Sequence, residues 1–406
     1  MQLTVHRLQL PRKLQRALVF GIVLATCCLW IQVFLRKRVV NPIAGNEWSL
    51  GTDLGNIIHK YPPINLAIYV REEPNLMQFY TLLKNILYYQ GRKKMNTSGC
   101  LLSVQTISNR GCPTVKLPPP NPLLLHLVVD EESRLNITRT FNDWKLVNVY
   151  VIFYEYKRYK SLVEPYGGSK SIGEAGMMKL LWPEIIKVPT TKIILLDTDM
   201  LFNRNITELW NMFDDFKSTQ MIGGVFEQTY YRKGLITSPG FPILKSGINT
   251  GMLLLHIERM RKMKWSELWR NTTKILLAKA TMMSIGDQAV FNQILYRNPT
   301  YLYEIPCEWN YVLFGNPNPV RCPIVWMFKL FDKENCLLAA TSQTRELRLA
   351  GLVHFVSQLK PEELDQPDHQ NLRPVSRIKI FSMEEMQRTF KEVYYAFRKL
   401  SFKCFL

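Results

Sequence analysis

Short apolar runs alternate with amphipathic stretches through the first half of the chain. These runs are rich in β-branched and aromatic residues and cover 64–70, 123–130, 147–156 and 192–197. Helix-like spacing occupies the gaps between them, and strands that alternate with helices form largely parallel sheets. The pattern therefore predicts an α/β fold in which helices flank a mostly parallel sheet.

Two later segments, 260–280 and 382–400, have helical spacing with basic residues on the outer face, and we interpret them as solvated surface helices. The segment 91–122 breaks the rhythm, because it contains two cysteines, a glycosylation sequon and a run of prolines. We predict that this segment is a surface insertion closed by a disulfide between Cys100 and Cys112.

The N-terminal apolar run, 17–35, has no charged residue and would span about 28 Å as a helix, close to the thickness of a bilayer core. It is long for a cleaved signal peptide and no convincing small-residue cleavage site follows it, so we interpret it as an uncleaved signal anchor. Basic residues on its two sides favour a cytoplasmic N-terminus only slightly. The predicted organisation is a cytoplasmic tail at 1–16, the anchor, a stem at 36–61 and a lumenal domain at 62–406.

Sequons and cysteines are compatible with a lumenal position for the main body. The N-x-S/T sequons lie at Asn96, Asn136, Asn205 and Asn271. Of the 8 cysteines, all but Cys27 and Cys28 follow the anchor, and their even number permits disulfides while leaving many connectivities open. No C-x-x-C pair occurs among those that follow the anchor, which argues against a structural zinc site.

The chain carries a net charge of +19, and 47% of its residues are hydrophobic. This hydrophobic content is enough for a packed core, and the charge indicates acidic partners such as nucleic acid, anionic lipid or a small anionic substrate. The basic residues are spread along the chain without a zinc-finger, RNA-recognition or basic-zipper pattern, so we do not expect nucleic-acid binding. A small phosphate- or carboxylate-bearing substrate fits better.

Two aspartates, Asp197 and Asp199, end the apolar run of the segment TKIILLDTDMLF. Residues i and i+2 of an extended segment point to the same side, so both carboxylates would lie together at the carboxyl end of a buried strand. Ligands of open α/β sheets bind at this edge, and carboxylate oxygens suit Mg²⁺ or Mn²⁺ together with substrate phosphate. The pair predicts half of a metal–diphosphate site, although a polar strand end followed by a helix cap at 205–208 would give the same pattern.

Three further segments place polar residues beside predicted strands or helices. SGINTGMLLLHI puts Asn249 between glycines before a strand, and SIGDQAVFNQIL opens a helix with Asp287 and Gln288. These side chains could bind a ligand, although turn chemistry and a favourable first-turn acid explain them equally well. In LVHFVSQLKP, His354 ends a strand-like run and Lys360 follows it. A lone histidine is more often structural, but these two would complete a metal shell and neutralise a diphosphate.

Four segments, in this order, resemble glycosyltransferase family 8: LLDTDMLF, GINTGMLLL, GDQAVFN and VHFVSQLKP. Members of this family are metal-dependent, retaining sugar transferases with a GT-A fold, which is a Rossmann-like mixed sheet flanked by helices. The similarity runs from about Ile64 to about Pro361. Within the family, GMMKLLWPEI, RKMKWSELW and IPCEWNYVL are most similar to the xylosyltransferase domain of the LARGE-type enzymes. GDQ followed by PCEWNY is also similar to the glucoside xylosyltransferases, and both groups use UDP-xylose.

The resemblance implies a role for individual positions. The residues that would bind Mn²⁺, or Mg²⁺ in its place, are Asp197, Asp199 and His354. Those that would contact the UDP-sugar donor are Lys179, Thr198, Asn249, Thr250, Gly251 and Lys360. The catalytic residues at the reacting face of the donor sugar would be Asp287 and Gln288. Cys307 and Cys322 match a cysteine pair of the LARGE-type domain, which implies a disulfide between them.

The first strand runs into YVREEP, where relatives have a Cys-Ala-Gly or Cys-Gly type turn beneath the uridine, so we expect different contacts to the base. The resemblance implies a single-pass type II enzyme of the Golgi, or of the ER, that transfers a sugar with retention of configuration. We expect the sugar to be xylose from UDP-xylose and the acceptor to be a glycan on a glycoprotein. Two alternatives stay open: a family member that uses UDP-glucose or UDP-galactose, and a catalytically silent lumenal binding protein on the same fold.

Overall fold

The computed structural model describes residues 41–43, 47–50, 62–92, 100, 121–166, 173–186, 189–228, 241–279, 286–313, 322, 324–325, 348–356 and 383–405. The predicted membrane anchor, 17–35, lies outside these residues. Within the described ranges, no helix is both long and apolar enough to span a bilayer.

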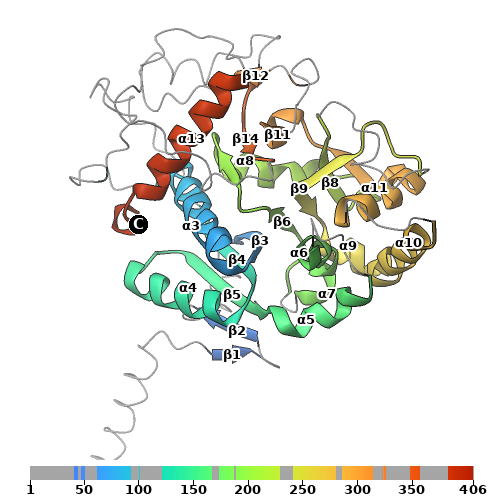
Figure 1. The fold of residues 1–406 in the computed structure, drawn as a ribbon, viewed down its shortest axis with the longest axis horizontal. Coiled ribbons are helices and arrows are strands. Elements are labelled where there is room, and N and C mark those ends of the chain that lie inside the picture. Colours follow the sequence, from blue (N-terminus) through green and yellow to red (C-terminus); the bar gives the residue numbers. More distant parts are fainter. Residues whose placement is uncertain are drawn as a thin grey trace, which may run out of the picture.

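A nine-stranded mixed sheet forms the centre of the molecule (Figure 1). Its central strands are parallel and follow the order β5 (Val149–Glu155), β4 (Leu123–Val129), β3 (Ile64–Val70) and β6 (Ile193–Leu196). The sheet continues beyond β6 with β9 (Ile248–Leu255), β8 (Ile222–Phe226) and β10 (Leu302–Glu304), and β9 is antiparallel to both of its neighbours. The four predicted strands and their parallel arrangement are confirmed.

The opposite edge of the sheet is a hairpin within the segment interpreted as a stem, 36–61. Strand β2 (Glu47–Leu50) pairs antiparallel with β5, and β1 (Asn41–Ile43) pairs antiparallel with β2. The sequence predicted no strand here, because runs of 3 and 4 residues are too short to show an alternating pattern. Backbone pairing with the exposed edge of β5 selects the strand conformation instead.

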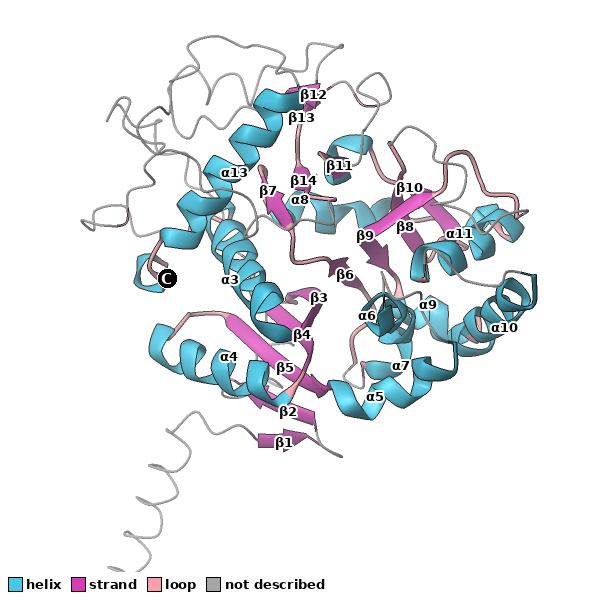
Figure 2. Cartoon of the chain, viewed as in Figure 1, coloured by secondary structure: helices cyan, strands magenta, loops and turns pink. Residues whose placement is uncertain are grey.

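Helices cover both faces of the sheet (Figure 2). Alternate residues of the central strands belong to two separate hydrophobic cores, one containing Leu66 and Leu125 and the other Ala67 and Leu124. The first core includes α3 (Glu72–Tyr89), α4 (Glu131–Trp144) and α13 (Met383–Lys399). The second includes α5 (Tyr156–Val163), α6 (Gly173–Met178), α7 (Trp182–Ile185), α9 (Ile257–Lys262), α10 (Trp265–Lys279) and α11 (Asp287–Arg297). Burial on both faces explains why these strands read as continuous apolar runs.

A small three-stranded sheet lies beyond the carboxyl end of β6. Its order is β11 (Tyr311–Val312), β14 (Leu352–His354) and β7 (Met200–Phe202), with β14 parallel to β11 and antiparallel to β7. Helix α8 (Ile206–Asn211) follows β7, and the separate strands β12 (Ile324–Val325) and β13 (Arg348–Leu349) pair with each other. The small sheet matters for function because it joins the segment after the two aspartates to the strand that carries His354.

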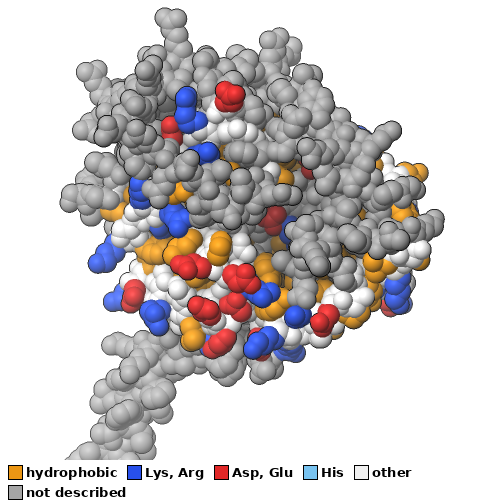
Figure 3. Space-filling view, viewed as in Figure 1, with side chains coloured by type: hydrophobic (Ala, Val, Ile, Leu, Met, Phe, Trp, Pro, Cys, Tyr) orange, Lys and Arg blue, Asp and Glu red, His pale blue; other side chains and the backbone are white. Residues whose placement is uncertain are grey.

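Both predicted surface helices are present, and the first is divided in two. Helix α9 ends at Lys262 and α10 begins at Trp265, with Lys264 between them in the left-handed region at a φ of 53°. Elsewhere on the surface, acidic and basic side chains are intermixed where α4 and α5 face the viewer in Figure 3.

The predicted Cys100–Cys112 disulfide is wrong. Cys100 is bonded to Cys404, with their Cα atoms 5.3 Å apart, and Cys112 lies outside the described residues. The C-terminal 3₁₀ turn η9 (Phe402–Cys404) packs against α4, where the rings of Trp144 and Phe402 have centroids 3.8 Å apart. This packing brings the C-terminal turn to Cys100 across a sequence separation of 304, which no local pattern could indicate.

Candidate active site and metal centre

The two aspartates lie in the link between the main sheet and the small sheet. Strand β6 ends directly before Asp197, and β7 begins directly after Asp199. The backbone N–H of Asp197 donates to the carbonyl oxygen of Gly251 (2.8 Å). The backbone N–H of Phe355 donates to the carbonyl oxygen of Asp199 (2.9 Å). Backbone hydrogen bonds on both sides therefore hold the two carboxylates at the edge of the sheet, as the sequence predicted.

His354 meets the two aspartates from the neighbouring strand of the small sheet. It pairs with Met200 in the β14–β7 ladder, and its Nε2 lies 3.4 Å from Asp199 Oδ1 and 3.9 Å from Asp197 Oδ2. One ligand atom of each residue lies within 4.8 Å of the others. In the described part of the chain, no other group of three or more His, Cys, Asp or Glu residues has such an arrangement.

This set of donors fits Mn²⁺ or Mg²⁺. Two carboxylate oxygens are the ligands that both hard cations prefer, and the imidazole nitrogen favours a transition metal such as Mn²⁺. The side chains of His354 and Asp199 are 6% and 7% exposed, whereas that of Asp197 is 32% exposed. The group is therefore enclosed by protein on one side and open on the other, where substrate oxygens could complete the coordination.

Lys179 places a positive charge against this group. It begins the 3₁₀ turn η3 (Lys179–Leu181), and its Nζ lies 2.8 Å and 3.0 Å from the two carboxylate oxygens of Asp197. Nζ also donates to the Thr250 carbonyl oxygen (3.2 Å) and lies 3.7 Å from Asp287 Oδ2. Burial lowers the pKa of Lys179, but the carboxylates of Asp197 and Asp287 outweigh this effect and raise it above its usual value. The ammonium group therefore stays charged.

Asp287 and Gln288 begin α11 close to Lys179. The carboxylate of Asp287 is 5% exposed, and burial raises its pKa, while Lys179 and a hydrogen bond from Thr250 oppose the shift. Asp287 Oδ2 has no hydrogen-bond donor among the described residues, and Gln288 beside it is half-buried. A buried acceptor atom without a donor is suited to a ligand hydroxyl, and the contact with the donor sugar stays a prediction.

Asn249 uses most of its hydrogen-bonding capacity within the protein. Its Oδ1 accepts from the Gly251 N–H (3.0 Å) and from Asn310 Nδ2 (3.1 Å), and its Nδ2 donates to Glu227 Oε2 (3.0 Å). The residue is 5% exposed. Only one amide N–H remains for other contacts, so the structure makes Asn249 a support for the site, with limited capacity for a direct donor contact.

Gly251 leaves room for His354. A Cβ atom at this position would lie 2.1 Å from His354 Cε1 and 2.9 Å from Nε2. Any larger residue would displace the imidazole or the strand, because atoms cannot approach so closely. The backbone at Gly251 therefore has to approach the imidazole of His354 closely, which only a residue without a side chain allows.

Of the other residues predicted to contact the donor, the structure describes Thr198 but not Lys360. Thr198 is buried, and its hydroxyl donates to Gln78 Oε1 on α3 (2.8 Å). Lys360 lies outside the described residues. The residues that sequence reasoning missed are Gln78, Glu227 and Asn310, of which Asn310 lies in the quoted segment IPCEWNYVL. The predicted Cys307–Cys322 disulfide, which joins this segment to the residue at 322, is confirmed.

In the YVREEP turn, the guanidinium of Arg71 is surrounded by an aromatic ring and two carboxylates. The Arg71 guanidinium lies 4.6 Å from the centroid of the Tyr156 ring, 3.0 Å from Glu72 and 3.9 Å from Asp130. Glu72 has a φ of 66°, which is uncommon for a residue other than glycine. The carboxyl ends of β3, β4 and β5 thus present the partly exposed guanidinium of Arg71, a planar cation of the kind that stacks on nucleobases, over the buried ring of Tyr156.

Parts of this chain are similar in sequence to known proteins. The chain is similar to mouse xylosyl- and glucuronyltransferase LARGE2, with 34% identity over 204 residues that cover 50% of this chain and 30% of the mouse protein. It is equally similar to human LARGE1, over 50% of this chain and 27% of the human protein. The aligned region therefore spans less than a third of the length of these relatives.

Solved structures with a similar arrangement include two sugar transferases. Mouse xyloside xylosyltransferase 1 in its apo form has a TM-score of 0.48 and 19% identity, with coverage of 72% of this chain and 98% of that one. The galactosyltransferase LgtC, in complex with donor and acceptor sugar analogues, has a TM-score of 0.49 and 12% identity, with coverage of 82% and 95%.

The family model for glycosyl transferase family 8 matches residues 91–361. This range is most of the chain and contains Asp197, Asp199 and His354, whose side chains the fold brings together. The resemblance in the sequence motifs is thereby confirmed, and the chain belongs to glycosyl transferase family 8.

Proposed function

We propose that this chain is a retaining, metal-dependent xylosyltransferase that transfers xylose from UDP-xylose to a glycan acceptor on a glycoprotein. The observation that carries the proposal is the convergence of Asp197, Asp199 and His354 beside Lys179 at the carboxyl end of β6. A metal-binding group next to a charged lysine is suited to a nucleoside diphosphate leaving group. Membership of family 8 supports a nucleotide sugar as the source of that diphosphate.

Asp197, Asp199 and His354 would hold Mn²⁺, or Mg²⁺ in its place. When bound, the ion supplies Lewis-acid stabilisation of the negative charge on the diphosphate. Lys179 adds a second positive charge that belongs to the protein itself. Because Asp197, Asp287 and the Thr250 carbonyl oxygen contact its Nζ, the ammonium is oriented before substrate binds. Preorganised charge of this kind is among the largest contributions to catalysis.

Asp287 and Gln288 would contact the donor sugar at the start of α11. The Asp287 carboxylate can accept from a sugar hydroxyl at its Oδ2, and the Gln288 amide would lie at the reacting face. We infer that the acceptor hydroxyl attacks from the face that the diphosphate leaves. The new glycosidic C–O bond forms as the bond between sugar and phosphate breaks, and the leaving phosphate oxygen takes the acceptor proton. This sequence retains the anomeric configuration.

The choice of xylose rests on the relatives, which are named xylosyl- and glucuronyltransferases. UDP-glucose and UDP-galactose are the alternative donors. A panel of these sugars and UDP-glucuronate, assayed by UDP release and by transfer to simple glycosides, tests the choice. The proposal predicts the highest kcat/KM for UDP-xylose, and a preference for a hexose donor would overturn this part of it.

An Asp199→Ala variant tests the metal-dependent mechanism itself. We expect Mn²⁺-dependent UDP release to fall by about 10²–10³-fold, because the loss of a ligand removes charge stabilisation from the leaving group. Asp214→Ala is the control, since the Asp214 side chain is 80% exposed and forms a surface pair with Lys192. Unchanged Mn²⁺-dependent turnover in Asp199→Ala would contradict the assignment.

One observation favours a second candidate, a catalytically silent binding protein. Arg71 is already paired with Glu72 and Asp130 at the turn where relatives bind the uridine. Titration calorimetry with UDP-sugars separates the two candidates. Binding without hydrolysis, and without transfer to any acceptor of the panel, would favour the silent protein, whereas turnover with any donor would exclude it.

We infer that 17–35 anchors the chain in the Golgi or ER membrane as a single-pass type II protein. The disulfides Cys100–Cys404 and Cys307–Cys322 support an oxidising lumen for the domain, since such bonds are rare in the cytosol. The sequon residue Asn271 is exposed on α10 and is accessible to modification there. Protease protection in sealed microsomes, together with a mobility shift after glycosidase treatment, tests this topology. Digestion of the domain in intact microsomes would contradict it.

A further inference from the structure

The direction in which a histidine ligand points depends on the contact that its second ring nitrogen makes. Nε2 of His354 faces the two aspartates, and its Nδ1 lies 3.1 Å from Asn310 Oδ1. Asn310 is fully buried and ends the 3₁₀ turn η6 (Cys307–Asn310). Its contact with Nδ1 therefore decides which ring nitrogen carries the proton in the neutral imidazole.

The roles of the amide atoms follow from two groups whose hydrogen bonding is unambiguous. The Gly251 N–H can only donate, so it faces the oxygen of Asn249, and the Glu227 carboxylate accepts from the nitrogen of Asn249. The Asn310 atom that lies 3.1 Å from Asn249 Oδ1 is therefore the donor, Nδ2. Asn310 Oδ1 is left facing His354 Nδ1, which must donate to it.

We propose that Asn310 is a positioning residue of the metal site. By accepting from Nδ1–H, it fixes the tautomer and the ring orientation of His354, so that the Nε2 lone pair points to the space shared with Asp197 and Asp199. A lone pair that faces two carboxylates is repelled unless a cation lies between them. The proposal rests on the metal site of the proposed function, but not on the identity of the sugar or of the acceptor.

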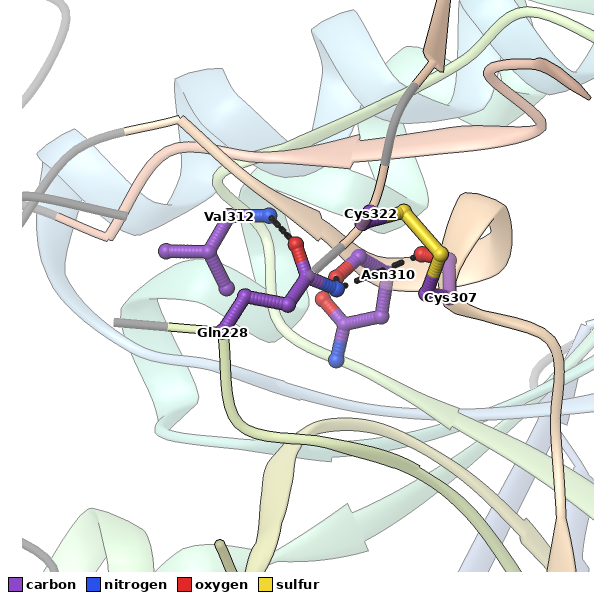
Figure 4. Close-up of a disulfide and its surroundings, with 5 residues drawn as sticks. All are labelled: Gln228, Cys307, Asn310, Val312 and Cys322. Atoms are coloured by element: carbon purple, nitrogen blue, oxygen red, sulfur yellow. Dashed lines mark hydrogen bonds between the residues drawn. A yellow bond between two sulfur atoms is a disulfide. The ribbon is translucent and has the colours of Figure 1, made fainter. Parts of the chain in front are cut away.

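The main chain of Asn310 is held independently of its side chain. Gln228 Nε2 donates to the carbonyl oxygens of Asn310 (3.0 Å) and Cys307 (3.3 Å), and the Val312 N–H donates to Gln228 Oε1 (3.2 Å). Figure 4 shows the Gln228 amide between Val312 and the Cys307–Cys322 disulfide. Substitution of the Asn310 side chain should therefore remove its contact with His354 without releasing η6.

Four variants test whether Asn310 positions His354 or only satisfies a buried polar group. Asn310→Leu keeps the size but removes the acceptor, and Asn310→Asp keeps an acceptor for Nδ1–H but loses the donor to Asn249. Asn292→Leu is the matched control, because Asn292 is 2% exposed and bonds both the N–H (2.6 Å) and the carbonyl oxygen (3.1 Å) of Ile248. Asn310→Ala makes the same prediction as Asn310→Leu with no added bulk, so the test stands if one of them fails to fold.

The first measurement is the tautomer of His354 in the metal-free, detergent-solubilised full chain. Nitrogen-15 spectra of histidine-labelled protein, at a pH where the rings are neutral, contain signals from 6 histidines, and His354→Gln identifies the relevant one. We expect the Nδ1–H form in the wild type and in Asn310→Asp, and a shift toward the Nε2–H form in Asn310→Leu. An Nε2–H wild type, or an unchanged tautomer in Asn310→Leu, would overturn the proposal.

The second measurement is the Kd for Mn²⁺ alone, from the electron paramagnetic resonance signal of the free ion. We expect Asn310→Leu to weaken binding by about 10–100-fold and Asn310→Asp to stay within about threefold of the wild type. Asn292→Leu should bind as the wild type does, even if its Tm falls as far as that of Asn310→Leu. Wild-type affinity in Asn310→Leu, or an equal loss in Asn292→Leu, would overturn the proposal. Absence of Mn²⁺ binding in the wild type would instead overturn the metal site of the proposed function.

Discussion

The metal edge, formed by Asp199, His354 and Asn310, and the seam between α3 and α13 are both buried, but different interactions hold each of them together. At the metal edge, directional hydrogen bonds run from His354 to Asn310 and from Asn310 to Asn249. In the seam, aromatic rings pack together, with ring centroids 5.3 Å apart for Tyr88 and Phe397. The seam ends at the C-terminal turn that the Cys100–Cys404 disulfide ties down.

The difference indicates a division between stability and function. Aromatic packing depends on buried area and tolerates small shifts, so damage to the seam should lower the free energy of unfolding and leave the metal edge in place. A polar network depends on the direction of each bond, so damage at the metal edge should move a ligand atom even where stability hardly changes. Each prediction below tests whether the two regions can be separated in this way.

The largest effect is expected for Cys404→Ser, which removes the disulfide to Cys100. The bond closes a loop with a sequence separation of 304, so its loss should lower the free energy of unfolding by about 3–5 kcal/mol. Chemical denaturation measures this change, and the Kd for Mn²⁺ at a temperature where the variant stays folded should remain within about twofold of the wild-type value. A loss of Mn²⁺ affinity that follows the loss of stability would show that the two regions are not separable.

Gly251→Ala should act mainly on Mn²⁺ affinity, in contrast to Cys404→Ser, which acts on the free energy of unfolding. Its new Cβ would overlap His354, so we expect Mn²⁺ affinity to fall by about 100-fold, equivalent to about 2.7 kcal/mol, because a ligand is displaced. Gly223→Ala in β8 is the matched control, since its Cβ would lie 2.9 Å from Phe216 and 3.0 Å from Leu254 in the core. The control should cost about 1–3 kcal/mol of stability and leave Mn²⁺ binding unchanged. Equal Mn²⁺ affinities in the two variants would contradict the structural reason for Gly251.

The smallest effect is a pH dependence in the seam. Burial, with a smaller contribution from the charge of Arg398, lowers the pKa of Lys84 from 10.5 to about 8. Between these two values Lys84 binds more protons in the unfolded chain than in the folded one, so it makes the free energy of unfolding rise with pH across this window, by about 1.4 kcal/mol per pH unit at most. Urea unfolding from pH 7 to pH 10 should show this rise in the wild type. The rise should be absent in Lys84→Met, and an equal rise in that variant would assign it to other groups.

The parts of the fold that the sequence predicted are those with a local signature. The strands at 64–70 and 192–197 are buried on both faces and therefore appear as continuous apolar runs. Asp197 and Asp199 were found because alternate residues of an extended segment share a side, and His354 because a family motif contains it.

The parts that could not be predicted depend on contacts between distant segments. The bonds of Asn310 to His354 and to Asn249 join residues 44 and 61 positions apart, and no periodicity marks such a pair. The same holds for Cys100 and Cys404, where proximity in sequence suggested the wrong partner. Asn249 was recognised as important, but only the tertiary structure shows that its amide faces the protein.

The central claim is that Asp197, Asp199 and His354 form a metal site that serves a nucleotide-sugar diphosphate. A calorimetric titration of the protein with Mn²⁺, in the absence and presence of UDP, tests it most directly. We predict one Mn²⁺ site per chain, tighter binding when UDP is present because its phosphates share the ion, and loss of the site in Asp199→Ala and in His354→Gln. Mn²⁺ binding of undiminished affinity in both variants, or binding in the wild type that UDP does not change, would contradict the account.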